Sequence, residues 1–515
     1  MLEQETMIPP FTKGNAGITE LLEYLHEIED LEALSSLAEW DQNTEMPEGA
    51  GEVRGYQSAT LQGVLHERWT NQRLGTLLNK LNAVINGSGY TDADRGLVRE
   101  AQRNYDRAMK LPRKLVEEMA RVQASSFEAW RRAREHNDFA SFAPWLGRTV
   151  ALQREVADHI GYTETRYDAL LDFFEPGMTT SALDKLFTPV REVSTTLLRR
   201  IEASGVIVDD SCLQGEFSEE KQVALSDVLL RRMGYDFSHG GIAVSPHPFT
   251  TSFGSPFDVR LTVHPDMHFI QSSVMAAIHE GGHAVYEQGS APTLVRTPLA
   301  GGASMGVHES QSRLWENAIG RSEAYWKGQF AAVQQAFPEH FVAIDAATFA
   351  RALNKVKPDL IRIEADEVTY NLHIIVRYEL EKAMINGDLA IESLPGQWNA
   401  MYQEYLGIEP TSNSEGVLQD IHWSSGFGYF PSYTLGNLYS AQIYSALRQH
   451  YSNFDERLAG GDTAFILGWL RKNIYAFGAI YQPDALMKRV TGEVPNPAFF
   501  TRYLTGKFEA IYQLQ

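Results

Sequence analysis

Two histidines and a glutamate lie within five residues of one another, in the order His279-Glu280-Gly281-Gly282-His283. Histidines four residues apart lie one turn apart on the same face of a helix, where both imidazoles can bind one metal ion. A glutamate next to the first histidine can take a proton from a water molecule beside that ion. The residues therefore predict a Zn²⁺ site with His279 and His283 as ligands and Glu280 as the general base.

A catalytic zinc site usually has three protein ligands and one open position, so a third donor must come from elsewhere in the chain. The metzincin pattern would place a histidine where Gly289 stands, and the spacing common in zinc aminopeptidases would place a glutamate where Gly302 stands. The first well-placed acid on a new helical run is Glu309, 26 residues after His283. His308 could replace it as ligand, but neighbours on a helix point about 100° apart. We predict Glu309 as the third ligand and His308 as a residue packed beside the site.

The segment Met275–Gly289 predicts a helix, with Asp266 as a cap upstream and Gly289 as its stop. Each interior glycine should cost this helix about 1 kcal/mol relative to alanine. At about 100° per residue, Gly281 faces away from the metal and Gly282 flanks it on the side opposite Glu280. We predict that the glycines let other elements approach closely, with the helix that carries Glu309 on the Gly282 side. The alternative is that they have no role.

The remaining sequence indicates which elements hold this site. Apolar residues recur every three or four positions from about 17 to 200, and helical patterning returns from Asp266 nearly to the C-terminus. Between them, "AVSPHPFTTSF" and "PFDVRLTVH" predict two strands joined by a turn. We therefore expect a mainly α fold with one small β-sheet. We treat 1–515 as a single catalytic unit, with a helical part to about 240 and the sheet, metal site and further helices in about 241–515.

The composition indicates which classes of binding partner and which cellular compartment to expect. The 66 acidic and 45 basic side chains give a formal charge of -21, which repels phosphate backbones and anionic membrane surfaces. We expect no nucleic-acid or membrane partner, and we interpret the charge as serving solubility. A single cysteine, Cys212, is typical of a reducing compartment, and neither a signal peptide nor a membrane-length apolar segment is evident. The protein is therefore expected to be cytoplasmic.

Six short motifs follow one another along the chain. They are HPF at 247–249, DVRLT at 258–262, HEGGH at 279–283, HESQ at 308–311, IRIEAD at 361–366 and GVLQDIHW at 416–423. With these motifs the sequence resembles the Taq-type zinc-dependent carboxypeptidases, a family of helical gluzincins. The resemblance implies an elongated, largely helical zincin-type peptidase with a deep active-site groove and a small sheet at its edge, often as a homodimer. It also implies broad-specificity release of single residues from peptide C-termini, with one Zn²⁺ per subunit and Co²⁺ as a possible substitute.

The Gly- and Tyr-rich segment that follows Ile421 offers donors for the oxyanion of the transition state. His422, Tyr429 and Tyr433 are the candidates, and the resemblance favours His422 with one of the tyrosines. The alternative for each tyrosine is a buried aromatic ring with a satisfied hydroxyl.

An exopeptidase must also recognise the free C-terminal carboxylate, and the fork of an arginine side chain suits that group. Arg362 is the first candidate and Arg260 the second. Either could instead pair internally, Arg362 with Asp366 and Arg260 with Asp258. We further expect the segment with His247 to be a strand that binds extended substrate at the sheet edge.

Two other functions are compatible with parts of this pattern. A related zinc endo-oligopeptidase would share the helical plan but lack an arginine for the C-terminal carboxylate. A helical binding protein with an inactive site would need neither the general base nor the metal. Glu280 and all three predicted ligands are intact, which argues against the binding protein.

Overall fold

The computed structural model describes residues 10–514. Residues 1–9, at the start of the N-terminal stretch in which no signal peptide is evident, lie outside the described residues. The chain is divided into two compact units. The first comprises Met1–Met109, Asp210–Leu353 and Ile443–Val494, and the second comprises Lys110–Asp209, Asn354–Gln442 and Pro495–Gln515. Both units draw on the chain before and after residue 240, so the predicted subdivision at that point does not coincide with them. The single catalytic unit over 1–515 stays a prediction.

The first unit contains the N-terminal helices, the sheet and the HEGGH helix. Its helices are α1 (Ala16–Thr44), α2 (Gly51–Trp69), α3 (Gln72–Asn82), α4 (Asp92–Lys110), α9 (Glu219–Met233), α10 (Ile270–Glu287), α11 (Met305–Arg313), α12 (Glu323–Ala336), α13 (Pro338–Phe341), α14 (Ala346–Ala352), α18 (Phe454–Ala459), α19 (Ala464–Asn473) and α20 (Pro483–Thr491). A π-helix, η5 (Leu314–Ile319), directly extends α11.

The second unit is a bundle of helices. They are α5 (Arg113–Glu135), α6 (Phe139–Ile160), α7 (Arg166–Leu171), α8 (Thr180–Ser204), α15 (Tyr370–Asn386), α16 (Leu394–Leu406) and α21 (Pro497–Tyr512), and α17 (Pro431–His450) begins in this unit. Helix α15 packs against α6, α7, α8 and α16 and is almost entirely buried. The predicted mainly α fold is confirmed.

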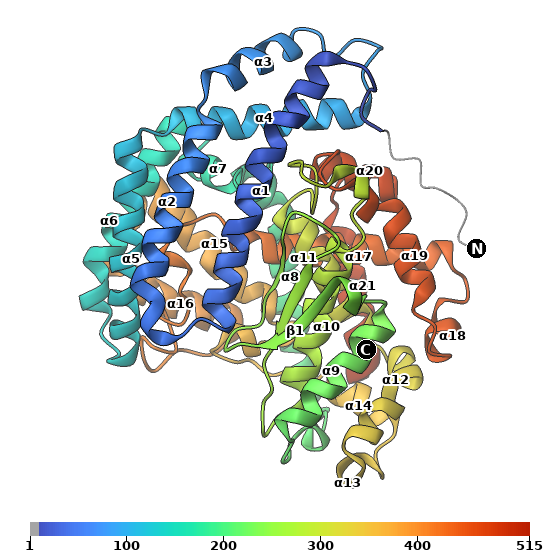
Figure 1. The fold of residues 1–515 in the computed structure, drawn as a ribbon. Helices are drawn as coiled ribbons and strands as arrows, with labels where there is room; N and C mark the ends of the chain where they lie inside the picture. The colour runs from blue at the N-terminus through green and yellow to red at the C-terminus, as the bar shows by residue number, and fades with distance from the viewer. Residues whose placement is uncertain (1–9, 515) are drawn as a thin grey trace. The chain divides into compact units, whose positions relative to one another are not determined.

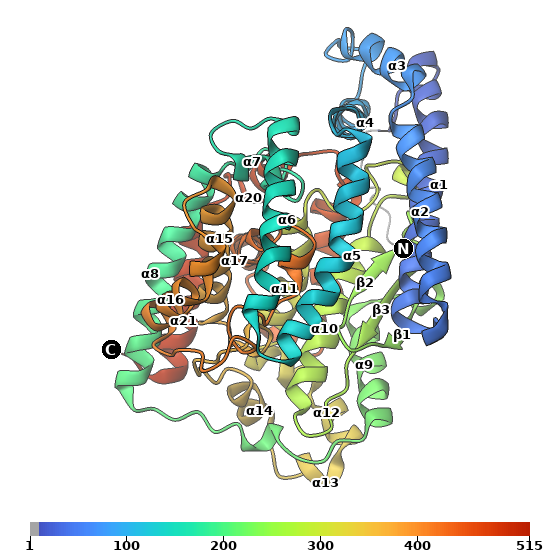
Figure 2. The ribbon, with the colours of Figure 1, turned by 90° about the vertical axis from the view of Figure 1, so that its left-hand side faces the viewer.

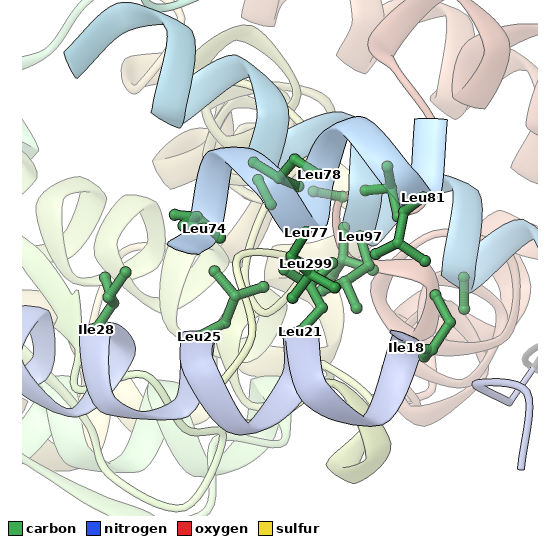
Figure 3. Packing of buried hydrophobic residues seen from close by; sticks show 14 of the residues in the cluster. Ile18, Leu21, Leu25, Ile28, Leu74, Leu77, Leu78, Leu81, Leu97 and Leu299 are labelled. Atoms are coloured by element: carbon green, nitrogen blue, oxygen red, sulfur yellow. The ribbon is translucent and has the colours of Figure 1, made fainter. Parts of the chain in front are cut away.

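The N-terminal helices pack through leucine and isoleucine side chains at helical spacing (Figure 3). Asn15 caps α1 by accepting hydrogen bonds from the backbone N–H groups of Gly17 and Ile18. Burial of an aliphatic side chain contributes about 1.5–3 kcal/mol, so such a stripe is enough to fix the helices of this layer on one another. The labelled members are Ile18, Leu21, Leu25 and Ile28 of α1, Leu74, Leu77, Leu78 and Leu81 of α3, Leu97 of α4, and Leu299.

One small sheet stands beside α10, as Figures 1 and 2 show. Its strands are β1 (Gly240–Val244), β2 (Thr250–Ser252) and β3 (Val259–Val263), in the order β1-β3-β2. Strand β1 is parallel to β3, and β2 is antiparallel to it. The small sheet is confirmed, but the expectation of two strands is wrong because the chain bends at 246–247 and separates β1 from β2.

His247, Pro248 and Phe249 therefore lie in the connection between β1 and β2 and not in a strand. The hydroxyl of Ser245 donates to the carbonyl oxygen of His247 at 2.7 Å, which closes the bend. Pro248 has no N–H group to give to a strand ladder. Local hydrogen bonding thus overrides the β-like composition of this stretch.

The predicted HEGGH helix is confirmed as α10, but its start differs from the expectation. Phe269 is the capping residue, and Asp266 lies three positions further upstream, where its Oδ1 accepts from the N–H groups of His268 and Phe269. The helix ends at Glu287, two residues before the predicted stop at Gly289. Among the described helices, none is long and apolar enough to cross a membrane.

Candidate metal centre and active site

The three predicted ligands meet where α10 packs against α11. One ligand atom from each of His279, His283 and Glu309 lies within 4.8 Å of the others. The Nε2 atoms of His279 and His283 are 3.7 and 3.4 Å, respectively, from the same oxygen, Oε2 of Glu309. Two imidazoles and one carboxylate are a donor set that catalytic zinc sites use. The residues present therefore fit a zinc ion.

Charged partners prepare these groups for a cation. Although burial acts to raise it, Arg313 and the two histidines hold the pKa of the Glu309 carboxyl well below its usual range. Burial lowers the pKa of His283 to about 4, so its ring is neutral near pH 7, as a metal ligand requires. Arg313 donates from Nε to Oε1 of Glu309 at 2.7 Å, which leaves Oε2 on the side of the histidines.

A second carboxylate orients His279. Oε2 of Glu316 is 2.8 Å from Nδ1 of His279 and 3.0 Å from Nη1 of Arg313. Glu316 belongs to the π-helix η5, a form that often occurs at functional sites. A carboxylate on the far nitrogen of a ligating histidine fixes the ring and its tautomer, so Nε2 is the atom left for a metal.

His283 has its own chain of partners. Its Nδ1 is 2.6 Å from Nδ1 of His308, and Nε2 of His308 is 2.7 Å from Oε1 of Glu287. Ser252 in β2 donates to the other oxygen of Glu287 at 3.0 Å. His308 thus contacts the Nδ1 side of His283 and is not part of the three-residue ligand group. This agrees with the prediction that it packs beside the site.

Glu280 lies next to the group and is held by the sheet. Thr250 in β2 donates its hydroxyl to Oε2 of Glu280 at 2.7 Å. The glutamate is 6% exposed, and this burial raises its pKa above the usual value, against the opposing effects of His279 and the Thr250 hydrogen bond. A single, directed carboxylate of raised basicity is what a general base needs.

The two glycines of α10 stand at close approaches to other elements, as predicted. A Cβ added at Gly282 would lie 2.7 Å from the carbonyl oxygen of Gln311 and 2.7 Å from Cα of Ser312 in α11. A Cβ added at Gly281 would instead meet the side-chain ends of Leu230 and Met233 in α9, at 2.5 and 2.9 Å. The glycine on the metal flank therefore lets the helix that carries Glu309 come within backbone contact of α10.

In the second unit, Arg362 forms part of a buried charge cluster. Its Nε and Nη2 donate to Oδ1 of Asp420 at 3.0 and 2.9 Å, and its Nη1 is 3.3 Å from the Tyr370 hydroxyl. Arg377 donates from Nε to the other Asp420 oxygen at 2.6 Å. The alternative of an internal pair with Asp366 is wrong in its partner, because Asp366 accepts from backbone N–H groups at the start of α15. Two guanidinium groups and one carboxylate leave a net positive charge here.

His422 and Tyr433 come together in the same unit. Nε2 of His422 is 3.3 Å from the Tyr433 hydroxyl. Burial lowers the pKa of His422 to about 4, against the opposing effect of Asp420, so the ring is neutral near pH 7 and can donate one hydrogen bond. The ring of Tyr429 packs edge-on against Phe174 at 5.1 Å and stands 5.9 Å from the His422 ring.

Arg260 and His247 lie in or next to the sheet of the first unit. Arg260 makes a bidentate pair with Asp258, with both contacts at 2.8 Å, and lies over the ring of Phe253. This is the internal pairing that the sequence left open, and it occupies the fork that a substrate carboxylate would use. His247 is exposed in the bend after β1.

Several partners of the site were not identified from the sequence. They are Thr250, Glu287, Arg313, Glu316, Arg377 and Asp420. Arg313 and Glu316 follow Glu309 by four and seven positions, a helical spacing that places side chains on one face and could have indicated them. Thr250 and Asp420 act on groups 30 and 58 residues away, respectively, and no local pattern signals such contacts.

Known proteins resemble this chain over nearly its whole length. The sequence profile described as carboxypeptidase Taq (M32) metallopeptidase matches residues 20–508. Thermostable carboxypeptidase 1 of Thermus thermophilus is 40% identical, with 96% of this chain and 99% of that protein covered. Carboxypeptidase 1 of Bacillus subtilis is 37% identical, with 96% and 98% covered. The crystal structure of an M32 carboxypeptidase from Deinococcus radiodurans superposes with a TM-score of 0.92 at 36% identity, covering 97% of this chain and all of that one.

The match extends over nearly the whole of the chain and of its relatives, so it does not rest on one shared motif. The resemblance inferred from the six motifs is confirmed. The chain belongs to the carboxypeptidase Taq (M32) metallopeptidase family, and it is a metallocarboxypeptidase that acts on peptides.

Proposed function

We propose that this carboxypeptidase binds one zinc ion per chain through His279, His283 and Glu309 and releases single residues from peptide C-termini. The observation that carries the proposal is the convergence of the three ligand atoms within 4.8 Å of one another. When bound, such an ion supplies Lewis acidity, which polarises a carbonyl group and makes water acidic near neutral pH. Cobalt, with similar ligand preferences, is proposed as a possible substitute.

Glu280 acts as the proton carrier in this proposal. Its carboxylate takes a proton from the attacking water and passes it to the leaving amine. The Thr250 hydroxyl, 2.7 Å from Oε2, keeps the carboxylate in one orientation between the two transfers. Burial of the group shifts its pKa toward neutrality, where a base can both accept and return a proton.

His422 and Tyr433 are proposed to donate hydrogen bonds to the carbonyl oxygen as it gains charge. The neutral ring of His422 and the phenol of Tyr433 each carry one N–H or O–H donor. Tyr429 is the second tyrosine candidate, although its packing against Phe174 fixes its ring by an aromatic contact. Donors of this kind are worth about a hundred-fold or more in turnover when correctly placed.

Arg362 is proposed to bind the C-terminal carboxylate of the substrate, and Arg260 is the weaker candidate because Asp258 occupies its fork. Arg362 uses three of its five N–H groups on Asp420 and Tyr370. The second guanidinium group, that of Arg377, offsets the charge of Asp420, so the cluster can accept one more anion. We keep His247 as a proposed contact for extended substrate, now from an exposed bend.

Metal analysis tests the ligand set. We expect purified protein to carry about one zinc ion per chain. Glu309→Ala and His283→Ala should lose the ion, because two remaining ligands do not hold it. Glu323→Ala, which alters an exposed ion pair on α12, is the control and should keep it. Elemental mass spectrometry gives the stoichiometry and distinguishes zinc from cobalt. Full metal content in the Glu309→Ala protein would refute the ligand assignment.

The carboxylate role of Arg362 predicts a selective loss. Arg362→Ala should lower kcat/KM for peptides with a free C-terminus by about 10- to 100-fold, because a hydrogen bond to a charged group is worth about 1.5–3 kcal/mol. Amidated peptides, already poor substrates, should change little, and Arg362→Lys should not restore the loss. Arg260→Ala tests the weaker candidate in the same way. Arg231→Ala, which removes an exposed ion pair with Asp227 on α9, is the control and should leave both substrate types unchanged. If Arg362→Ala lowered kcat/KM equally for both substrate types, Arg362 would be only a structural partner of Asp420. If the wild-type protein itself showed no preference for the free acid, it would be an endo-oligopeptidase.

Broad preference for the released residue, a homodimeric state and a cytoplasmic location remain predictions. Mass spectrometry of a peptide mixture before and after incubation reads the preference directly. Light scattering at several protein concentrations reads the oligomeric state.

A further inference from the structure

The segment that carries His422 and Tyr429 has little regular structure of its own. Between Gly416 and Phe430 the chain forms only the short 3₁₀ turn η8 (His422–Ser424). Its own backbone hydrogen bonds are local turns, such as those from the N–H groups of Ser425 and Gly426 to the carbonyl oxygen of His422. The position of the segment in the second unit therefore depends on contacts to neighbouring elements.

Helix α15 supplies such contacts on both sides of His422. Arg377 binds Asp420, two residues before the histidine. One turn further along the same helix, Glu381 accepts from the indole N–H of Trp423 at 2.9 Å and from the backbone N–H of Gly428 at 3.0 Å. The residues after His422 and before Tyr429 are therefore tied to one carboxylate.

Glu381 is suited to this task by its surroundings. It is 1% exposed, and its Oε2 also accepts from the Tyr167 hydroxyl of α7 at 2.6 Å. Three donors converge on its two oxygens, an arrangement that suits an ionised carboxylate, while burial raises the pKa of the group to about 7. A buried carboxylate is costly unless its oxygens are satisfied, so such a group is an unusual choice for packing alone.

The backbone at Gly428 explains why a side-chain acceptor is needed there. Gly428 has φ +96°, and an added Cβ would lie 2.7 Å from the carbonyl oxygen of Leu170 in α7. The chain is thus pressed against α7 in a conformation that only glycine adopts readily. The N–H group of Gly428 points to Glu381 instead of to a backbone partner of a ladder.

We infer that Glu381 is a positioning residue for catalysis, which anchors Trp423 and Gly428 and thereby places His422 and Tyr429 for their work on the substrate. This inference rests on the proposed function of the His422 segment. The Trp423 ring also contacts the rings of Trp398 and Phe430, so fixing Trp423 also restrains the aromatic rings around His422.

Glu381→Gln tests the anchor with almost no change of size. The amide offers one acceptor oxygen and an NH₂ group that faces a donor, so one of the two segment contacts must weaken. At pH 8 and with saturating zinc, we expect kcat to fall about 10- to 100-fold with a smaller change in KM, as for small misplacements of catalytic groups. Hydrogen–deuterium exchange of peptides covering 423–430 should rise, while peptides from α10 should not change. Trp423→Phe, which removes only the indole donor, should shift both readouts in the same direction.

Tyr167→Phe is the matched control, because it removes the third donor to Glu381 but leaves both segment contacts. It should keep the exchange pattern and kcat close to the wild-type values. Unchanged exchange and kcat in Glu381→Gln would overturn the inference. The inference would also be overturned if Glu381→Gln showed raised exchange but full kcat while His422→Ala was inactive, because catalysis would then not depend on the contacts to Glu381. Full activity of His422→Ala and Tyr429→Phe would instead refute the proposed function of the segment, whatever the exchange experiment shows.

Discussion

Replacing Glu280 by glutamine is expected to leave the protein folded and metal-loaded but nearly inactive. Glutamine has the same shape and its amide oxygen can still accept from the Thr250 hydroxyl, which is 2.7 Å from Oε2 in the wild type. It cannot take a proton from water at any working pH. Loss of a general base typically costs about 10²- to 10⁴-fold in turnover, so we expect kcat to fall in that range for Glu280→Gln.

Three measurements on the same preparation make this result specific. Turnover of a chromogenic peptide gives kcat, elemental mass spectrometry gives the zinc content, and thermal unfolding reports the fold. Glu323→Gln, in an exposed ion pair on α12, controls for the handling of variants and should match the wild type in all three. A Glu280→Gln protein that retains more than about a tenth of the wild-type kcat would exclude Glu280 as the base.

The sequence was most informative where a contact is local or repeats along one helix. The spacing of His279 and His283 is one helical turn, and the structure places them on one face of α10. The pair of Arg260 with Asp258 was foreseen as an alternative because the residues are only two positions apart, with Asp258 directly before β3 and Arg260 within it. The same helical geometry predicted that α11 approaches α10 on the side of Gly282, and the structure places it there.

Contacts between distant residues could not be read in this way. The partner of Arg362 is Asp420, which is 58 residues away, whereas the sequence offered the nearer Asp366. The backbone N–H groups at the start of α15 bind Asp366, and a helix start competes for a nearby carboxylate. The third strand was missed for a related reason. Strand β1 pairs in parallel with β3 across an intervening bend, and composition does not reveal such pairing.

At Gly282, an added methyl group has two opposing effects on stability, a gain in helix propensity and a steric overlap with α11. In a free helix, Gly282→Ala would gain about 1 kcal/mol. Here the new methyl group would lie 2.7 Å from both the Gln311 oxygen and Cα of Ser312, and backbone atoms cannot rotate away. Overpacking of this kind costs about 1–3 kcal/mol or more, so we expect a net loss of unfolding free energy.

The same overlap should reach the metal, because the backbone that must move lies two to three residues after Glu309. A shift of α11 displaces the Glu309 carboxylate from the two histidines, whose Nε2 atoms now lie 3.7 and 3.4 Å from its Oε2. Disturbance of the groups that orient a ligand typically costs about 10- to 100-fold in metal affinity, and we expect a loss of that size. Urea unfolding of the metal-free protein and competition with a chromophoric chelator measure the two effects separately.

Gly281→Ala is the matched control for both effects, because it changes the adjacent residue of the same helix in the same way. Its methyl group would meet the ends of Leu230 and Met233, which are flexible side chains that can adopt other rotamers. The gain in helix propensity should then roughly offset the repacking, with zinc affinity unchanged. The contrast between the two alanine variants isolates backbone contact with α11 as the cause, since propensity alone predicts that both stabilise the helix equally. A Gly282→Ala protein as stable and as tight for zinc as Gly281→Ala would show that α11 can retreat without moving Glu309.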